Sequence, residues 1–447
     1  MLPSMQLKLK NLVEKLPVSV GRSLSLVPFT FRLGLSYQRM RQVIESSESA
    51  DNAYRDAEYL AKLRSLIRFA AGHVEFYREF YRQQGFVAED IQTLADWDNV
   101  PIVTKADLQS AHLDARCIKG AKGMKINTSG TSGQKLEFLI DNQAFAREWA
   151  HMHHLWFARG YRPQHVKLAF RDRYFDPAQA LRYNSVHNEY IVNANSPMIQ
   201  VVEAVLALQR STVIRWLHGC PSVVAEFAHA LSTQTPSVLS GFQSRLYGVL
   251  LRSEYPLPLY RSVIERVLST NLVSWYGHSE MAILAHETAH GVYQSFPTYG
   301  YAEAIPLDAE PFRRLVCTSL HNRVHPFIRY DTGDLISSIT GHDGSLVFQI
   351  GEGRASDFIL DRQGKRHALM TFLFGRNHSA FDLVQHVQVR DEGQGRITLV
   401  VTPKNKDVNI VRLKQGFNLE NLDIDWDLEI VNAPFRTLVG KIQLKLN

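Results

Sequence analysis

The chain has 447 residues, 45% of them hydrophobic and 21% charged, which is typical of a globular protein of two or three domains. No run of about 18 uncharged apolar residues occurs and the first residues lack the apolar core of a signal peptide, so we expect neither a spanning helix nor a secretory leader. The net charge is +6, and the Lys and Arg residues are scattered along the chain without a long basic run. This distribution favours anionic small molecules over nucleic acid as ligands. The three distant cysteines form neither a disulfide framework nor a zinc pattern, which indicates a cytoplasmic protein.

Residues 1–100 are predicted to be mostly helical. Leu60, Leu63, Leu66 and Ala70 recur at three- and four-residue spacing, which places them on one face of a helix. The basic, amphipathic stretch at residues 8–32 is expected to pack on the core, and a position on a membrane surface is its alternative.

A hydroxyl- and glycine-rich segment follows, between short strands predicted at Met124–Ile126 and Leu136–Ile140. Inward backbone N–H groups, hydroxyls and one lysine would suit a polyphosphate rather than a metal ion. A flexible linker is the alternative. The spacing is not that of the common phosphate loop of kinases and GTPases, and no helix follows directly. The residues that would form the phosphate loop are Thr128, Ser129, Gly130, Thr131, Ser132, Gly133 and Lys135.

From residue 122 to 350, short apolar strands alternate with helices, a pattern that predicts an α/β sheet. Strands are expected at Val166–Phe170, Leu246–Leu251 and Asn271–Trp275, and helices at Val201–Gln209, Pro221–Leu231 and Leu259–Leu268.

Two loops follow predicted strands, at residues 252–255 and 276–280. Ligands bind beyond the carboxyl ends of strands in open α/β sheets, so both loops are candidate ligand loops. In the second loop, Tyr276 offers an aromatic face to a purine and Ser279 can donate a hydrogen bond to a phosphate. Glu280 can hold Mg²⁺ through its carboxylate. An ordinary solvated turn is the alternative for this loop.

The segment Arg329–Leu335 carries two carboxylates, Asp331 and Asp334, three residues apart around a glycine. An aspartate can accept hydrogen bonds from both hydroxyls of a ribose. A general acid/base pair is a second interpretation. A hairpin turn is the third, because Asp-x-Gly-Asp is also turn chemistry.

From residue 346 onward the sequence predicts a small α+β unit. Strands are expected at 346–350, 358–360, 397–401 and 428–431, with a helix near 409–416 and a turn at Gly351–Arg354. We place a domain boundary near Arg354–Asp357, which gives an N-terminal domain of residues 1–355 and a C-terminal domain of residues 356–447. Lys441 follows a glycine close to the end of the sequence, where lysines are usually solvated.

These segments, in this order, resemble the motifs of the adenylate-forming superfamily of acyl-CoA synthetases and related ligases. Residues 128–135 look like its phosphate loop, 276–280 its aromatic–Gly–x–Ser/Thr–Glu motif, 330–334 its ribose-binding motif and 440–441 its catalytic-lysine motif. The segments at 74–77, 100–105 and 218–222 are similar to the phenylacetate–CoA ligase branch, especially its CapK-like members.

The resemblance implies a large α/β adenylation domain with a helical leader and a small α+β domain that rotates about a hinge at Ser356 or Asp357. It also implies two chemical steps: a carboxylate attacks the α-phosphate of ATP, and a thiol, commonly that of coenzyme A, then displaces AMP. By this resemblance Lys441 and Glu280 are the catalytic residues, with Glu280 also holding Mg²⁺. The residues implied to bind the nucleotide, besides the phosphate loop, are Ser253, Glu254, Tyr276, Gly277, His278, Ser279, Asp334 and Arg354.

Three questions stay open at this stage. The chain shows no clear coenzyme A signature, so transfer of AMP to a non-carboxylate acceptor and a non-catalytic role are alternatives to thioester formation. His151, His153 and His154 are candidates to line the acyl pocket, and a packed helix face is the alternative. We expect an organic acid, ATP and an acceptor as partners, no nucleic acid, and leave monomer and homodimer open.

Overall fold

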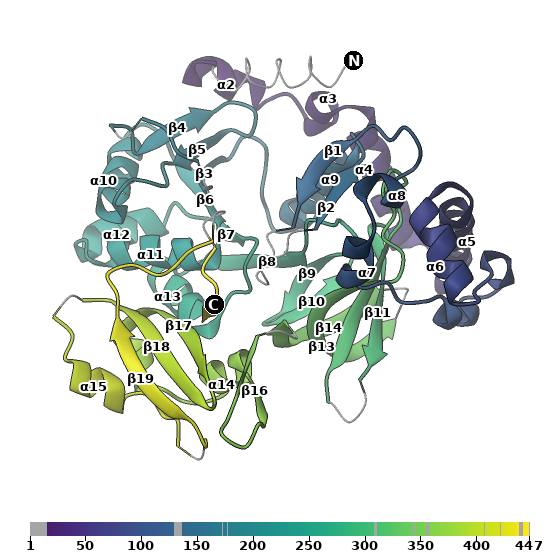
Figure 1. The fold of residues 1–447 in the computed structure, drawn as a ribbon. Coiled ribbons are helices and arrows are strands. Elements are labelled where there is room, and N and C mark those ends of the chain that lie inside the picture. The colour runs from purple at the N-terminus through teal and green to yellow at the C-terminus, as the bar shows by residue number, and fades with distance from the viewer. Residues whose placement is uncertain are drawn as a thin grey trace. The chain divides into compact units, whose positions relative to one another are not determined.

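The computed structural model describes residues 16–128, 136–171, 173–176, 178–307, 311–342, 345–354, 357–405, 407–420, 422–437 and 441–446 (Figure 1). Its internal contacts divide the chain into two compact units, each made of segments that are distant in sequence. The first unit contains the residues up to Pro28, Trp156–Ser274 and Asp357–Asn447. The second contains Phe29–Leu155 and Trp275–Ser356.

The first unit is built on a mainly parallel sheet with the strand order β4-β5-β3-β6-β7-β8. Strands β3, β5 and β7 are buried at every residue, as expected for parallel strands that are covered on both faces. Strand β4 pairs antiparallel with β5 at one edge. The strands are β3 (Val166–Phe170), β4 (Leu181–Asn184), β5 (Glu189–Val192), β6 (Ile214–Gly219), β7 (Gly248–Leu251) and the first residues of β8 (Asn271–Gly277).

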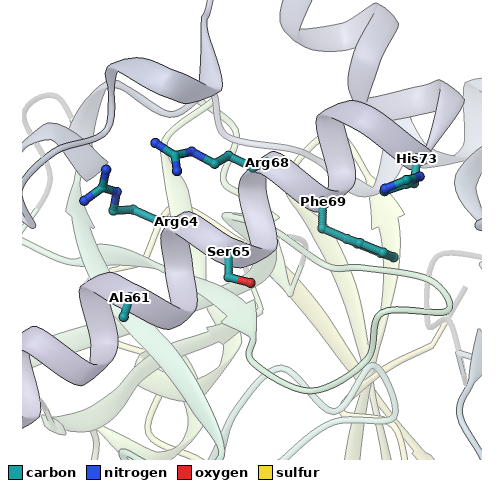
Figure 2. A pocket seen from close by; sticks show the side chains of 6 residues that line it. All are labelled: Ala61, Arg64, Ser65, Arg68, Phe69 and His73. Carbon is teal, nitrogen blue, oxygen red and sulfur yellow. The ribbon is translucent and has the colours of Figure 1, made fainter.

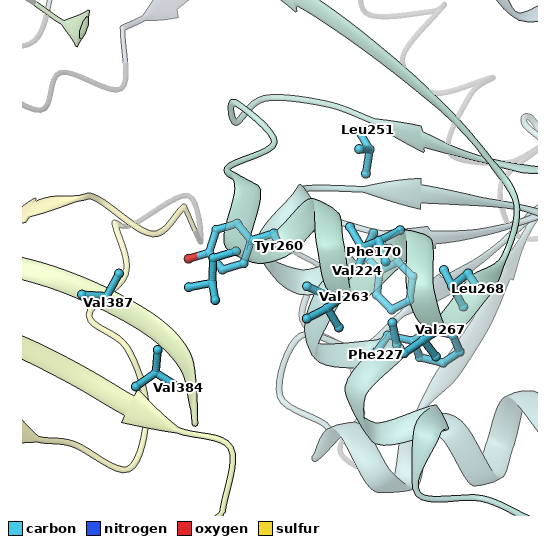
Figure 3. Packing of buried hydrophobic residues seen from close by; sticks show 14 of the residues in the cluster. Phe170, Val224, Phe227, Leu251, Tyr260, Val263, Val267, Leu268, Val384 and Val387 are labelled. Atoms are coloured by element: carbon cyan, nitrogen blue, oxygen red, sulfur yellow. The ribbon is translucent and has the colours of Figure 1, made fainter. Parts of the chain in front are cut away.

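Helices cover this sheet, and three of them begin with a proline in the first turn, where the missing N–H costs no hydrogen bond. Their apolar faces form a buried cluster with the strands that includes Phe170, Val224, Phe227 and Val263 (Figure 3). The helices of this part are α2 (Val18–Leu24), α10 (Met198–Leu208), α11 (Pro221–Ser232), α12 (Pro236–Gln243) and α13 (Pro258–Leu268).

The C-terminal part of the first unit contains a four-stranded sheet with the order β19-β18-β17-β20. Strands β17 and β18 are antiparallel, whereas β20 and β19 pair parallel with them at the two edges. Val384 and Val387 of β17 belong to the same buried cluster as Tyr260 of α13 (Figure 3). The elements are β15 (Phe358–Leu360), β16 (Arg366–Ala368), α14 (Leu369–Phe374), η3 (Ser379–Asp382), β17 (Val384–Gly393), β18 (Arg396–Pro403), α15 (Ile410–Gln415), β19 (Asp425–Ile430) and β20 (Lys445–Leu446).

The second unit combines helices with an antiparallel sheet of order β11-β12-β13-β14-β10-β9-β8, in which the last residues of β8 pair with β9. Its strands are β9 (Leu284–Ala289), β10 (Val292–Ser295), β11 (Gly300–Pro306), β12 (Arg313–Ser319), β13 (Tyr330–His342) and β14 (Ser345–Arg354). A hairpin of β1 (Met124–Asn127) and β2 (Glu137–Ile140) stands apart from this sheet.

The helices of the second unit come mainly from the N-terminal third of the chain, as the sequence predicts. Leu63, Leu66 and Ala70 are buried on one face of the longest of them. No helix in the described ranges is both long enough and apolar enough to cross a bilayer. The helical elements are α3 (Phe29–Leu33), α4 (Leu35–Ser49), α5 (Asn52–His73), α6 (Glu75–Gln83), η1 (Ala88–Asp90), η2 (Ala95–Asn99), α7 (Lys105–Ser110), α8 (Leu113–Arg116) and α9 (Ala144–Ala158), which ends in the first unit.

The predicted fold class, an α/β sheet with a separate small C-terminal α+β sheet, is confirmed. The turn predicted at Gly351–Arg354 is wrong, because these residues continue β14 and pair with β13. Gly351 is needed for close packing, since a Cβ there would lie 2.5 Å from the ring of Phe312. The division of the chain near residue 355 and the hinge stay predictions.

A buried ion pair joins neighbouring strands of the first unit. Lys167 of β3 and Glu189 of β5 are register partners, and their charged groups lie 3.8 Å apart. Arg171 lies 2.9 Å from the same carboxylate. Burial would raise the pKa of Glu189, but the charges of Arg171 and Lys167 outweigh it and lower the pKa from 4.5 to about 2. The ionised carboxylate is therefore the form that stabilises the fold.

We expect Glu189→Gln to lower the free energy of unfolding by about 3–5 kcal/mol, because it leaves buried cations without their counter-charge. Since the folded-state pKa of Glu189 is below its unfolded value, its contribution is present above pH 4.5 and is lost as the pH falls toward 2. Urea unfolding at several pH values measures both effects. The control is Glu79→Gln at an exposed ion pair with Arg82, which should change little. An equal loss in both variants would contradict the assignment.

Candidate functional site

The second unit brings together five residues of two predicted motifs. Tyr276 lies near the end of β8, and its hydroxyl donates a hydrogen bond to the carboxylate of Asp334 on β13. The Tyr330 hydroxyl donates to Glu280 Oε1 at 3.3 Å. On the other side, His278 Nδ1 lies 3.2 Å from Glu280 Oε2. Two carboxylates predicted to act on the nucleotide and its metal are thus each held by a tyrosine.

The backbone around Asp334 explains this placement. The register between β12 and β13 shifts after Asp331, and Gly333 has a φ of +74°, which favours glycine. The Asp331 carboxylate accepts the Gly333 N–H at 2.9 Å and lies 3.4 Å from Arg314. Asp331 therefore shapes the bulge and pairs with a cation, while Asp334 alone contacts Tyr276. This arrangement replaces the predicted hairpin turn with a bulge and does not support a paired general acid and base.

The leader segment that follows the first helices holds the start of β13. Val103 forms a parallel bridge with Tyr330: its N–H donates to the Arg329 carbonyl at 3.0 Å and its carbonyl accepts the Asp331 N–H at 2.9 Å. Arg329 is buried, and its guanidinium lies 2.9 Å from the carboxylate of Glu303. The sequence analysis did not assign these roles, although Arg329 and Tyr330 lie inside the segment that it singled out.

The other predicted site residues of this unit are Gly277, Ser279 and Arg354. Gly277 and Ser279 are exposed next to buried Glu280. A Cβ on Gly277 would lie 3.0 Å from a methyl group of Leu284, so a larger residue would crowd this point. Arg354 is the register partner of Asp334 across β13 and β14.

The phosphate loop is described only at its base. The Thr128 N–H donates to the Leu136 carbonyl, and the Leu136 N–H donates to Thr128 Oγ1, both at 3.0 Å. The two strands predicted on either side of the loop are present and pair as a hairpin. The two Thr128–Leu136 bonds join these strands at the base of the loop. Ser129, Gly130, Thr131, Ser132, Gly133 and Lys135 lie outside the described residues.

A second group of predicted residues lies in the first unit. Ser253 follows β7 and has a φ of +67°, in the left-handed region. The adjacent Glu254 accepts the backbone N–H of Ser222 and that of Ile442, each at 3.2 Å. Burial raises the pKa of Glu254 above its usual value, while the charge of Lys441 acts in the opposite direction. The loop predicted to line the adenine and the segment of the predicted catalytic lysine are thus in contact.

Comparisons with known proteins identify the fold. The chain is similar to 2-hydroxyisobutyryl-CoA ligase in its postadenylation state in complex with R3-HIB-AMP, with a TM-score of 0.63 and 17% identity over 88% of this chain and 90% of that chain. It is also similar to the GH3.15 acyl acid amido synthetase, with a TM-score of 0.54 and 12% identity over 82% and 85% of the two chains. The chain has the fold of the adenylate-forming ligases.

Sequence comparison gives a weaker but concordant signal. No protein-family model matches the chain. Protein CapK of Staphylococcus aureus is 19% identical over 386 residues, which cover 83% of this chain and 85% of CapK. The predicted resemblance to the adenylate-forming superfamily is confirmed at the level of the fold, and the match to CapK supports the CapK-like branch.

Glu280 is the carboxylate that the sequence predicts to hold Mg²⁺. The described residues contain no cluster of three or more His, Cys, Asp or Glu side chains that could hold a metal ion. Mg²⁺ in nucleotide sites is commonly held by one or two carboxylates together with substrate phosphates and water. Glu280 is a candidate for this mode: the Tyr330 hydroxyl contacts its Oε1, and His278 lies 3.2 Å from its Oε2.

The histidines of α9 pack into the second unit. His151 Nε2 lies 2.9 Å from the hydroxyl of Thr298, and burial lowers the pKa of His151 to about 3. His153 is buried as well, and His154 lies 2.7 Å from Glu48. These contacts agree with the packed helix face and not with a row of free pocket-lining imidazoles.

A surface groove of about 660 Å³ lies along α5, and none of the predicted site residues lines it (Figure 2). Arg323 donates to Ser65 at 2.8 Å, and its guanidinium lies 5.0 Å from the centre of the Phe69 ring. Arg64 donates to Gln92 at 2.9 Å. We assign this groove no part in the site. Its lining residues are Ala61, Arg64, Ser65, Arg68, Phe69 and His73.

Thr128→Val should lower the free energy of unfolding by about 1–3 kcal/mol, because it leaves the N–H of buried Leu136 without its acceptor. Thr128→Ser keeps the hydroxyl and is the matched control. Differential scanning calorimetry of the two variants measures the difference. If the serine variant loses as much stability as the valine variant, the hydroxyl at residue 128 does not stabilise the base of the hairpin.

Proposed function

We propose that the protein is an ATP-dependent, AMP-forming ligase that activates an organic acid as its acyl-adenylate and transfers the acyl group to coenzyme A, in surface-polysaccharide or secondary metabolism. One observation carries the proposal: on the fold of the adenylate-forming ligases, Tyr276, Glu280 and Asp334 gather at the ends of β8 and the start of β13. Similarity to 2-hydroxyisobutyryl-CoA ligase supports the reaction class, and similarity to CapK supports the CapK-like branch.

The carboxylates in this cluster suit the two polar ends of the nucleotide. Asp334 would accept hydrogen bonds from the ribose hydroxyls, while Tyr276 holds its carboxylate from one side. Glu280 would hold Mg²⁺, which neutralises phosphate charge when bound. Residues 128–135 would contact the β- and γ-phosphates, and Arg354 the ribose or phosphates. His278, which lies beside Glu280, would complete the wall of the metal site.

In the first step an oxygen of the substrate carboxylate forms a bond to the α-phosphorus, and the bond to pyrophosphate breaks. Negative charge builds at phosphorus, so fixed donors and a cation stabilise this transition state. Lys441 would supply that cation, and Ser253 and Glu254 would line the adenine. In the second step the coenzyme A sulfur bonds to the acyl carbon and AMP leaves.

Three buried free cysteines agree with a reducing, cytoplasmic setting.

Pyrophosphate exchange into ATP, screened over aromatic, fatty, hydroxy and amino acids, tests the first step. We expect Lys441→Ala to reduce acid-dependent exchange by about 100- to 1000-fold, because one preorganised donor is lost at the transition state. The control is Lys414→Ala, an exposed lysine paired with Asp427, which should keep full exchange. Exchange at the level of the unmodified protein in Lys441→Ala would remove this lysine from the mechanism. Absence of exchange with every acid, or a stable adenylylated acceptor, would contradict the ligase proposal.

Asp334→Ala should weaken ATP binding by about tenfold or more, since hydrogen bonds to a charged group contribute about 1.5–3 kcal/mol each. Isothermal titration calorimetry with ATP and Mg²⁺ measures this without knowledge of the acid. Asp427→Ala removes an exposed carboxylate of the C-terminal sheet and is the control. Unchanged affinity in Asp334→Ala would show that Asp334 does not hold the ribose.

A further inference from the structure

Residues 435–437 and 441–443, here called the two arms of the Lys441 turn, bond to each other. Arg436 and Ile442 form an antiparallel bridge. The Thr437 N–H donates to the Lys441 carbonyl at 2.8 Å, and the Lys441 N–H donates to the Thr437 hydroxyl at 3.1 Å. The residues just before and just after positions 438–440 are therefore paired with each other.

Gln388 of β17 joins the two arms at their base. Its side-chain amide donates to the carbonyls of Phe435 and Gln443, at 2.9 and 2.8 Å, and its oxygen accepts the Phe435 N–H at 2.7 Å. Gln388 is 1% exposed, so these bonds are shielded from water. Both partner residues lie in the C-terminal part of the first unit, which means that this amide orders the turn without help from the large sheet.

Two carboxylates from the large-sheet part of the first unit contact the turn, one on each arm. Glu226 of α11 forms an ion pair with Arg436 on the first arm. Glu254 accepts the Ile442 N–H on the second arm, and its other oxygen accepts the N–H of Ser222 at the start of α11. The carboxylate of Glu254 is thus shared between the positive end of this helix and the turn.

Glu226 also meets the C-terminal sheet. Its carboxylate lies 2.9 Å from His386 Nε2 of β17, and His386 Nδ1 lies 3.2 Å from the hydroxyl of Tyr260 on α13. Burial would raise the pKa of Glu226, but His386 and Arg436 outweigh it and lower that pKa. Two residues of the C-terminal part, His386 and Arg436, therefore contact Glu226 and favour its ionised form.

We propose that Glu226 and Glu254 form a two-carboxylate clamp that holds the Lys441 turn against the start of α11. The clamp positions Lys441 and is broken whenever the C-terminal part moves away. Glu226 is a positioning residue in this scheme, because it acts on Lys441 through Arg436. That consequence for catalysis rests on the proposed function, whereas the clamp itself does not.

Hydrogen exchange measured by mass spectrometry on the full chain tests the clamp. We expect Glu226→Gln and Glu254→Ala to speed exchange in the peptide covering residues 435–446 by about tenfold or more, since each variant removes a bond to a charged group. Arg436→Gln should give the same increase as Glu226→Gln, and the double variant should give no more than either. The control is Glu429→Gln, which breaks an ion pair with Arg390 in the same C-terminal sheet and should leave the peptide unchanged.

Exchange in β18 serves as the check of folding in every variant. If a variant loses protection there, Arg436→Gln, at a side chain that is 29% exposed, decides the question in its place. Unchanged exchange of the turn in Glu226→Gln and Glu254→Ala, or additive effects of Glu226→Gln and Arg436→Gln, would overturn the clamp.

Kinetics connects the clamp to the reaction. With an acid found in the exchange screen, Glu226→Gln should lower kcat for pyrophosphate exchange and leave the KM for ATP unchanged, because Glu226 contacts the turn and not the predicted nucleotide residues. A changed KM with unchanged kcat would contradict a positioning role. If no acid supports exchange in the unmodified protein, the proposed function fails, and the hydrogen-exchange result still decides whether the clamp exists.

Discussion

The buried carboxylate of Glu254 is the constraint on which the arrangement of the first unit's candidate site depends. A carboxylate in such a place needs hydrogen-bond donors, and two backbone N–H groups from distant parts of the chain supply them. One belongs to Ser222, where the unpaired N–H groups of α11 carry partial positive charge. The other belongs to Ile442. Because both bonds use the backbone, the contact depends on the position of the chain and not on the side chain at residue 442.

The carboxylates of the second unit follow a different rule. Asp331 and Glu303 lie within ion-pair distance of Arg314 and Arg329. Asp334 and Glu280 receive hydrogen bonds from tyrosine hydroxyls, and Glu280 also lies 3.2 Å from His278 Nδ1. A carboxylate that is to attract a metal ion or accept ribose hydroxyls needs its negative charge, so the groups around Asp334 and Glu280 matter for the roles that we propose for them.

The sequence predicted the elements whose signal is local. Strand β3 has the bounds read from its apolar run, and α11 and α13 begin near prolines that suit a first turn. The four motif segments were found because glycines, hydroxyls and carboxylates recur at short spacing. The bulge before Asp334 was not predicted, because it depends on pairing with β12, and the end of β14 was taken for a turn on the strength of its glycines.

Contacts between distant segments were beyond the reach of sequence patterns. Gln388 and His386 lie in β17, a strand that the sequence analysis did not predict, and Glu226 lies on a helix where a glutamate usually indicates only a solvated face. Their roles arise from side chains that meet across more than forty residues of chain, as Gln388 and Phe435 do. No spacing rule reports such a meeting, because it is decided by the tertiary packing of the C-terminal part.

Two sets of contacts on the Lys441 turn divide the work of positioning the lysine. Gln388 belongs to the same C-terminal part as the turn, so its three hydrogen bonds would persist if that part rotated about the predicted hinge. Glu226 and Glu254 belong to the large-sheet part, so the same rotation would break their bonds. A lysine that is to act in one step of the proposed reaction and leave before the next needs both a stable internal order and a docking that can be reversed. The apolar packing of Tyr260 with β17 stabilises the contact between the two parts by burying surface, but it does not fix one geometry. The directional bonds of the two carboxylates define the position of the turn.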